Sequence, residues 1–442
     1  MDKVFEAVKT LQAYLWNFPM LVLLLGTHIY FTFRLGIIQK RIPEGIRKSF
    51  ARAEGGTGNV SPYSALATAL AATIGTGNII GISTAIAVGG PGAVFWCWIT
   101  GVFGIATCYA ESFLSVKYRV KRSDGSYVGG PMYVLEGVLH KKWAAVLFSA
   151  FAVLASLGIG SSVQAYSISS AIQGQMDISP HIIGIVTSLL AGMVIIGGGK
   201  QIAKVCTFLV PIMSFFYLGG CFYIIFRNSA WLPETLRVII GSAFSSKSFV
   251  GGIAGTGVLA AMRVGISKGL FTNEAGLGSI PMAAASARTS SPVRQGIISM
   301  TGTFWDTVVM CAITGIAIVG SMVRCPEKYK CIPQDRLCFV AFSDLPISGE
   351  VILSISLILF AFATIIGWNY YGECAVEYLF GKKGIKNYQI IYLFAVYLGA
   401  VMSLELVWGV SDLFNSLMAI PNIACIWLLQ KTIIQDTCKE KK

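Results

Sequence analysis

The sequence has few charged side chains for its length, and this shortage excludes most soluble folds. Of its 442 residues, 12% are Asp, Glu, Lys or Arg, whereas 55% are hydrophobic. A soluble globular domain carries roughly 25% charged residues, because its whole surface faces water. This chain has too little charge to cover a water-exposed surface of its size.

Residues that build catalytic and nucleotide-binding sites are also scarce. The chain has three histidines, and its 11 cysteines do not follow metal-ligand spacing. No Ser–His–acid arrangement is visible, and the G-x-x-x-x-G-K-[ST] loop of ATP-driven transporters is missing. The segment Gly75-Thr76-Gly77-Asn78 follows no strand, so it does not predict a dinucleotide loop. We therefore expect neither an enzyme nor an ATP-driven pump, and no organic cofactor.

Apolar stretches recur along the whole chain. About 20 residues at 1.5 Å per residue cross a ~30 Å hydrocarbon core, and only helices pair their own backbone groups there. We expect an all-α polytopic membrane protein, for which the lipid bilayer is the solvent. Eleven spans are predicted, near 14–33, 62–87, 92–116, 145–170, 181–198, 202–226, 253–288, 296–322, 349–371, 387–407 and 411–433.

The net charge of +13 is concentrated in alternate loops. Lys and Arg gather in 34–57, 117–142, 200–204, 288–294 and 382–386, whereas 171–180 and 407–411 have none. Positively charged loops stay in the cytoplasm. The pattern predicts a multi-pass protein of a bacterial inner (plasma) membrane with its N-terminus outside and its C-terminus cytoplasmic. No basic stripe interleaved with aromatic residues occurs, so no nucleic-acid partner is expected.

The ten spans after the first divide into two groups of five, which would insert with opposite topology. Span two is interrupted at Gly75-Thr76-Gly77-Asn78, and span seven, about 200 residues later, at Asn273-Glu274-Ala275-Gly276-Leu277-Gly278. Glycine-interrupted segments at corresponding positions indicate a transporter binding site. We expect an N-terminal helix and basic linker (1–61), a first five-helix repeat (62–230), an inverted second repeat (231–433) and a cytoplasmic tail (434–442).

Two facing helix breaks have the right polarity for a zwitterion. At Gly75 and Gly77 the outer half-helix exposes N–H groups with partial positive charge, which suit a carboxylate. Carbonyl groups that end the first half of span seven, after Thr272, suit an ammonium group or a sodium ion. The alternative is that the glycines only permit close helix packing.

Three segments resemble motifs of the alanine or glycine:cation symporter family. They are Gly89-Gly90-Pro91-Gly92 through Gly104, Leu270-Phe271-Thr272-Asn273-Glu274 through Ser279, and Gly367-Trp368-Asn369-Tyr370-Tyr371-Gly372-Glu373. The similarity covers essentially the whole chain. It implies the amino acid–polyamine–organocation type fold, with ten core helices in two inverted repeats of five. It also implies uptake of alanine or glycine, in L or D form, coupled to sodium and in some members to protons.

The resemblance also implies which residues form the site. Substrate carboxylate would be received by Thr76, Gly77 and Asn78, with Gln164 from span four. The pocket would be closed around a methyl-sized side chain by Phe271, Asn273 and Trp368.

A coupling sodium ion would lie between the carbonyls of Ala71 and Ile74 and the hydroxyl of Thr364. The chain departs from the family pattern at Ala363, where a second hydroxyl is usual. One oxygen ligand fewer leaves open whether sodium or a proton drives transport. A proton-coupled carrier of another small neutral amino acid or solute is therefore the alternative function. We expect the protein to act as a monomer.

Several of these polar residues have a structural alternative. Gln164 could make a packing hydrogen bond, Thr364 could bond its own helix, and Trp368 could anchor the membrane interface. Asn273 and Glu274 could cap the second half-helix, which is the role we favour for Glu274.

Two further expectations concern charge and cysteine. Asp306 is an isolated acid within span eight, and we expect it to pair with Arg263 or Lys268 rather than to couple ions. Cys325, Cys331 and Cys338 share one polar loop, where a disulfide would require an oxidising compartment.

Overall fold

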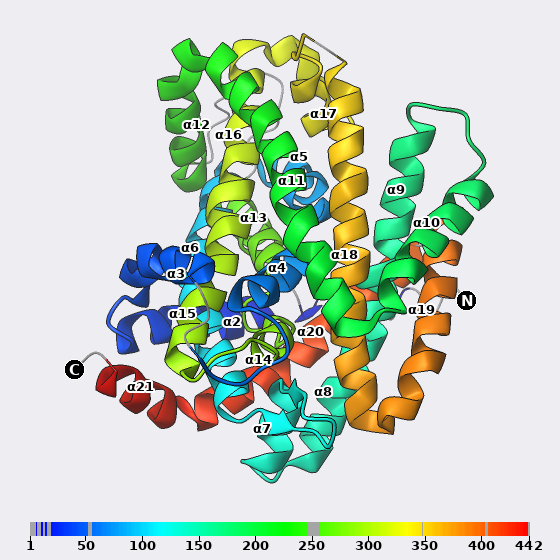
Figure 1. The fold of residues 1–442 in the computed structure, drawn as a ribbon. Coiled ribbons are helices and arrows are strands. Elements are labelled where there is room, and N and C mark those ends of the chain that lie inside the picture. The colour runs from blue at the N-terminus through cyan, green and yellow to red at the C-terminus, as the bar shows by residue number, and fades with distance from the viewer. Residues whose placement is uncertain are drawn as a thin grey trace.

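The computed structural model of the chain describes residues 6, 10–11, 14–15, 19–51, 55–245, 257–346, 348–402 and 405–440. Residues 1–5, 7–9, 12–13, 16–18, 52–54, 246–256, 347, 403–404 and 441–442, which the predicted segments include, lie outside the described residues. The described part is a bundle of helices with one two-stranded hairpin (Figure 1). In the hairpin, β1 (Val120–Lys121) pairs antiparallel with β2 (Tyr127–Val128).

The first half of the chain contains the predicted spans one to six. Its helices are α2 (Pro19–Arg34), η1 (Ile38–Arg41), α3 (Ile42–Phe50), α4 (Pro62–Thr73), η2 (Thr76–Asn78), α5 (Ile80–Gly89), α6 (Gly92–Lys117), α7 (Pro131–Gly137), α8 (Lys142–Ala155), η3 (Ser156–Ser162), α9 (Val163–Gln173), α10 (Pro180–Ile195) and α11 (Gly198–Arg227).

The second half contains the predicted spans seven to eleven. Its helices are η4 (Ser229–Trp231), α12 (Leu232–Phe244), α13 (Val258–Asn273), α14 (Ile280–Ala285), α15 (Pro292–Thr303), η5 (Phe304–Cys311), α16 (Ala312–Arg324), η6 (Pro326–Tyr329), α17 (Leu337–Phe342), α18 (Gly349–Phe380), α19 (Lys382–Val401), α20 (Glu405–Leu428) and α21 (Gln430–Lys439).

A helix occupies each of the eleven predicted positions, but the number of spans is not confirmed. Among the described residues, six helices are long and apolar enough to cross a membrane, and two bent pairs raise the number to eight. α10 is apolar but shorter, and α19 begins with lysines that lower its mean hydropathy. α3 and α12 are helices in segments that the sequence analysis treated as loops.

Both predicted interruptions are breaks between two half-helices. α4 ends at Thr73, α5 begins at Ile80, and the chain bends by 59° between them. α13 ends at Asn273, and three residues with positive φ follow it: Glu274 (53°), Gly276 (86°) and Gly278 (90°). Only glycine adopts such angles without strain, which explains the two glycines in this segment.

Two further helices are distorted at positions that no sequence signal marks. The helix from α8 to α9 is a π-helix over Ser156–Ser162, and the helix from α15 to α16 is a π-helix over Phe304–Cys311. Such π-helical turns are frequent at functional sites because they displace side chains from their ordinary positions.

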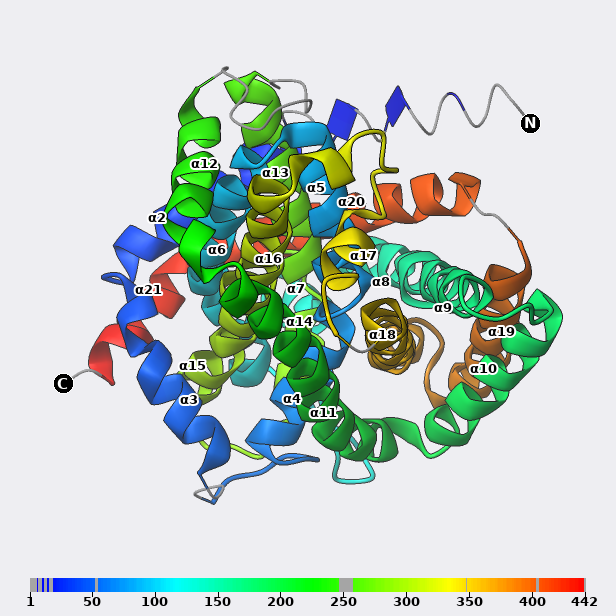
Figure 2. The same cartoon turned by 90° about the horizontal axis from the view of Figure 1, so that it is seen from above.

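Long helices surround the broken ones. α6 packs mainly against α13 and α15, and α18 contacts α4, α8, α9, α11 and α19. Figure 2 looks almost along the axis of α18, which runs through the molecule beside α4 and α11. In Figure 1 the β1–β2 hairpin, α7 and the junction of α18 with α19 lie at one end, whereas α12 and α17 lie at the other.

At the hairpin end, the chain before α4 runs along the chain after α14. Thr57 and Val60 form backbone bridges with Thr289 and Ala287, respectively. The two segments are so close that a Cβ atom on Gly58 would lie 2.3 Å from the carbonyl oxygen of Ala287. We call residues 57–60 and 286–289 the seam; it joins the chain next to one half of each broken helix.

The close approach of the two segments in the seam predicts that no residue larger than glycine fits at position 58. Gly58→Ala should destabilise the folded protein by roughly 1–3 kcal/mol, because the methyl group overlaps backbone atoms. A thermal melt of the purified protein measures this, with Gly26→Ala as the control, since a Cβ at Gly26 meets nothing within 4 Å. Equal melting temperatures for the two variants would contradict the prediction.

Candidate functional site

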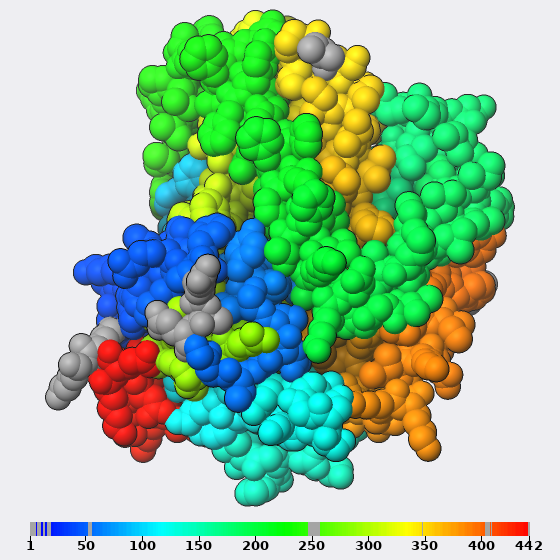
Figure 3. Space-filling model, in the orientation of Figure 1, coloured from blue at the N-terminus to red at the C-terminus, as the bar shows by residue number. Residues whose placement is uncertain are grey.

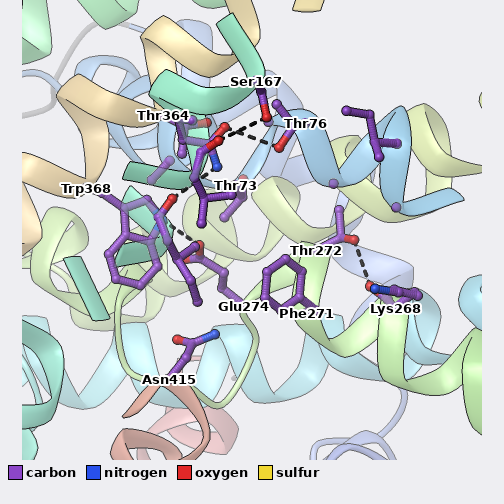
Figure 4. Close-up of a pocket in the computed structure, with 18 of the residues that line it drawn as sticks. Thr73, Thr76, Ser167, Lys268, Phe271, Thr272, Glu274, Thr364, Trp368 and Asn415 are labelled. Carbon is purple, nitrogen blue, oxygen red and sulfur yellow. Dashed lines mark hydrogen bonds between the residues drawn. The ribbon is translucent and has the colours of Figure 1, made fainter. Parts of the chain in front are cut away.

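A cavity of about 120 Å³ lies where the two helix breaks meet. Figure 4 shows Thr76 and Ser167 on one side of it, with Phe271, Glu274 and Trp368 on the other. Residues from five helical segments line it: Ala72, Thr73, Gly75, Thr76, Gly77, Ile80, Gly81, Thr84, Ile159, Val163, Gln164, Ser167, Lys268, Phe271, Thr272, Glu274, Thr364, Trp368, Asp412 and Asn415.

The first break is held open by Asn78. Its Oδ1 accepts a hydrogen bond from the Gly75 amide at 2.9 Å, and its Nδ2 donates to Asp306 Oδ1 at 2.8 Å. Asn78 is completely buried and does not line the cavity. No side chain of the described residues caps the start of α5, so the N–H groups of its first turn have no side-chain acceptor there, and Ile80 and Gly81 of this turn line the cavity.

Asp306 is buried in the π-helical turn of η5, where it accepts hydrogen bonds from Asn78 and from the Thr307 hydroxyl at 2.6 Å. Within the described residues it makes no ion pair with Arg263 or Lys268, so the pairing expected from the sequence is wrong. Lys268 instead lines the cavity. The sequence could not show that a π-helical turn directs Asp306 toward Asn78.

Thr76 and Gln164 form the polar side of the cavity. The Thr76 hydroxyl donates to Gln164 Oε1 at 3.2 Å, and Gln164 Nε2 donates to the Ile159 carbonyl at 3.1 Å. That carbonyl lies in the π-helix η3, where the backbone hydrogen bonds shift from the α-helical to the i→i+5 pattern. Ser167, one helical turn after Gln164, lines the same side.

The other side of the cavity is aromatic and acidic. Trp368 Nε1 donates to Glu274 Oε1 at 3.0 Å, and the Ser279 hydroxyl donates to Glu274 Oε2 at 2.6 Å. Trp368 is 1% exposed, so it is not an interface anchor. Glu274 lines the cavity, and among the described residues its carboxylate accepts from these side chains rather than from backbone N–H groups of α14, so it does not cap the second half-helix as expected. Asn273 lies outside the cavity lining and accepts a hydrogen bond from the Ala275 amide at 3.0 Å.

The second break is held by residues that the sequence analysis did not identify. Glu111 of α6 accepts hydrogen bonds from the Gly276 amide at 3.3 Å and from Asn422 Nδ2 at 2.8 Å. Asn422 Nδ2 also donates to the Gly276 carbonyl at 2.9 Å. The backbone N–H and C=O of Gly276 are therefore both paired. The sequence signals that could have identified these residues are an acid within an apolar span, Glu111, and an amide next to Pro421, Asn422.

The oxygens proposed for a cation lie at the edge of the cavity. The Thr364 hydroxyl is 3.2 Å from the Ala71 carbonyl oxygen, to which it donates a hydrogen bond. A Cβ atom on Gly75 would lie 2.7 Å from Thr364 Oγ1, so glycine leaves the space beside this hydroxyl free. Ala71 and Ile74 are buried but do not line the cavity, and Ala363 is buried without an oxygen to offer. Neutral carbonyl and hydroxyl oxygens are ligands that suit a hard cation.

The thiols of Cys325, Cys331 and Cys338 are free. Cys331 is exposed, whereas Cys338 is buried in α17 beside Tyr217. The disulfide that remained open on the sequence is therefore not formed in this structure.

Paired broken helices around a small cavity with polar and apolar walls define a secondary transporter of the inverted-repeat class. Solved structures support this fold. The TM-score is 0.60 to MhsT in complex with L-phenylalanine, at 15% identity, covering 85% of this chain and 90% of that one. It is 0.54 to a Na⁺-coupled sialic acid symporter, at 13% identity, covering 96% of this chain and 84% of that one.

The chain belongs to the sodium:alanine symporter family, whose model matches residues 1–441. It is 41% identical to the sodium/alanine symporter AgcS of Methanococcus maripaludis, over 99% of this chain and 97% of the relative. It is 39% identical to the probable sodium/glutamine symporter GlnT of Bacillus subtilis, over 97% of this chain and 89% of the relative. The protein is a membrane-embedded, cation-coupled amino acid symporter and not an enzyme.

The geometry predicts different outcomes for Gln164 and Asn78. Gln164→Ala should weaken amino acid binding by roughly tenfold to a hundredfold, because it removes a hydrogen-bond donor and acceptor from the cavity wall. Asn78→Ala should instead lower the melting temperature of the ligand-free protein, because the Gly75 amide and Asp306 both lose a partner.

Isothermal titration and thermal melts of the two purified variants separate these effects. A Gln164→Ala protein that melts well below the wild type and binds normally would contradict the assignment.

Proposed function

We propose that this protein carries alanine or glycine, in L or D form, into the cell together with sodium. The observation that carries the proposal is the size and lining of the cavity at the two breaks. At about 120 Å³ it is well below the ~300–1,000 Å³ of sites for drug-sized ligands. A substrate with a side chain no larger than methyl fits such a volume better than glutamine does.

The substrate carboxylate is placed at the first break. The amide end of α5 has partial positive charge, and Gly77 leaves backbone exposed to the cavity. Thr76 and Gln164 offer a hydroxyl and an amide beside it. Because a carboxylate accepts but cannot donate, the Thr76 hydroxyl would turn from Gln164 to the substrate.

The remaining groups of the substrate fit the second break. Carbonyl oxygens at the end of α13 receive the ammonium group. Phe271 and Trp368 enclose the small side chain, and Trp368 is held in place by its bond to Glu274. Asn78 and Asn273, which the resemblance places among the ligands, support the breaks from outside the cavity lining.

Sodium is placed between the carbonyls of Ala71 and Ile74 and the hydroxyl of Thr364. The 3.2 Å approach of Thr364 Oγ1 to the Ala71 oxygen supports this, because it brings two of the three oxygens together, and Gly75 leaves the space beside the hydroxyl free. The positive charge of the ion would compensate the substrate carboxylate nearby. A proton remains the alternative coupling ion because Ala363 supplies no second hydroxyl.

Transport then follows alternating access between two inverted repeats, 62–230 and 231–433, in a monomer. The alternation of basic loops supports an N-terminus outside and a cytoplasmic C-terminus in a bacterial inner membrane. In that orientation the hairpin end of the molecule in Figure 1 is cytoplasmic.

Uptake into proteoliposomes tests the substrate and the ion. Labelled alanine should accumulate when sodium is higher outside and should not accumulate when only a proton gradient is imposed. Unlabelled glycine should compete well and glutamine poorly, because the cavity is small. Accumulation driven by the proton gradient alone would overturn the choice of ion, and strong competition by glutamine would overturn the choice of substrate.

Thr364 gives a second test. Thr364→Val keeps the shape of the side chain but removes an oxygen, so half-maximal uptake should need at least ~10-fold more sodium. Ala363→Ser adds the missing hydroxyl and should lower that sodium concentration. If the sodium dependence of uptake is the same in both variants and the wild type, the ion does not bind here.

A further inference from the structure

A second, larger cavity of about 670 Å³ lies at the hairpin end of the molecule. It shares no lining residue with the binding cavity. Its walls come from the chain before α4, the β1–β2 hairpin, the start of α11, and the junction of α18 with α19. The binding cavity is lined by α5 and α13, the halves of the broken helices that point away from this end, and by the last two residues of α4, Ala72 and Thr73.

The side chain of Asn59 in the seam joins the hairpin through the backbone groups of Tyr127. Asn59 Nδ2 donates to the Tyr127 carbonyl at 2.7 Å, and the Tyr127 amide donates to Asn59 Oδ1 at 2.8 Å. These two bonds make Asn59 pair with β2 as a neighbouring strand would. The hairpin is thereby attached to the chain that leads into α4.

Arg119, which precedes the hairpin, strengthens this attachment. Its guanidinium donates to the carbonyl oxygens of Thr57, Ala285, Ala287 and Thr289, at 2.7–3.2 Å. The group also lies 4.6 Å from the centre of the Tyr127 ring. The hairpin, the seam and the cytoplasmic halves of both broken helices are therefore held together as one unit.

On its other side the hairpin is joined to α18 and α19 by ion pairs. Arg122 pairs with Glu377 near the end of α18, and Asp124 pairs with Lys382 at the start of α19. All four residues line the large cavity. In Figure 3 the cyan surface that includes the hairpin adjoins the orange surface of this helix junction.

We propose that the β1–β2 hairpin is a strap that closes the cytoplasmic end of the transport path and is latched to α18 and α19 by these two ion pairs. The proposal rests on the proposed function, because it assigns the large cavity to the release side. It adds a device that the substrate and ion assignments do not require.

The two kinds of attachment differ in how easily they break. Asp124 and Lys382 are 47% and 52% exposed, whereas Arg122 and Glu377 are 21% and 11% exposed and the Asn59–Tyr127 bonds are partly buried. Exposed ion pairs contribute little to stability and exchange readily with water. The pair with Lys382 therefore opens most readily, and the strap releases α19 and then α18 while the hydrogen bonds of Asn59 and Arg119 keep it attached to the seam.

The turn of the strap is fixed by hydrogen bonds, and its Asp124 is charged. The Arg122 amide donates to the Ser126 carbonyl at 2.8 Å, and the Ser126 amide donates to Asp124 Oδ1 at 3.0 Å, so the turn is fixed. Lys382 and Ser126 hold the pKa of Asp124 below its usual range. Asp124 is thus ionised at neutral pH, when it faces Lys382.

Cys374 provides a native reporter of opening. Its free thiol is buried and lines the large cavity. The rate at which a maleimide alkylates Cys374, followed by mass spectrometry on protein in nanodiscs, measures how often the cavity opens. Both faces are accessible in a nanodisc, so the measurement does not depend on orientation. Cys374→Ser confirms the assignment of the labelled peptide.

Charge reversals on the two ion pairs test the strap. D124K and K382D alone set like charges against each other and should speed alkylation of Cys374 roughly twofold to fivefold. The double variant D124K/K382D should return the rate to near that of the wild type. R122E, E377R and R122E/E377R should behave in the same way.

An ion pair far from the cavity provides the matched control. Lys330 and Glu327 form an exposed pair in the loop after α16, and K330E should leave the alkylation rate unchanged. Single reversals without effect on the rate, or double variants as fast as the single ones, would overturn the strap.

Alanine uptake by the same variants separates the strap from the proposed function. If the alkylation pattern holds but wild-type protein takes up no alanine, the strap is supported and the substrate assignment fails. If alanine is taken up but Cys374 reacts at one rate in all variants, the strap fails and the substrate assignment is unaffected.

Discussion

A helix that breaks inside a bilayer leaves backbone N–H and C=O groups that neither lipid nor the helix can pair. This requirement organises the centre of the molecule. At the first break, Asn78 accepts a hydrogen bond from the Gly75 amide and donates one to Asp306, which lies in a π-helical turn. At the second break, Glu111 and Asn422 take the amide and the carbonyl of Gly276. A buried acid from a neighbouring helix thus stabilises each break. Asp306 acts through the Asn78 amide, whereas Glu111 accepts directly from the backbone.

Groups that are left over on the cavity side line the cavity that we propose as the binding site. The supporting residues face away from the cavity, whereas Thr76, Gln164, Phe271 and Trp368 face it. Support and recognition are therefore divided between two layers of side chains. Because the backbone supplies much of the polarity, the cavity can accept a zwitterion with one lysine and few acids around it.

Much of the architecture could be predicted from the sequence, because hydropathy and glycine position determine where helices lie and break. The two breaks, and the gathering of Thr76, Gly77, Gln164, Phe271 and Trp368 around one cavity, follow from that pattern and from the family motifs. The pairing of Asp306 could not be predicted, because π-helical turns rotate side chains without a sequence signal. Asn78 and Asn273 share their motifs with residues that line the cavity, and only their three-dimensional partners show that they support the breaks.

The seam has a consequence for how the chain is inserted into the membrane. Residues 57–60 make their backbone bonds with 286–289, so more than half of the chain must be synthesised before the lead-in to α4 finds its partner. Until then Gly56 and Gly58 face no neighbouring strand. The first half of the protein would remain incomplete in the membrane until then, and the hairpin end of the molecule would close only after residues 286–289 have been synthesised.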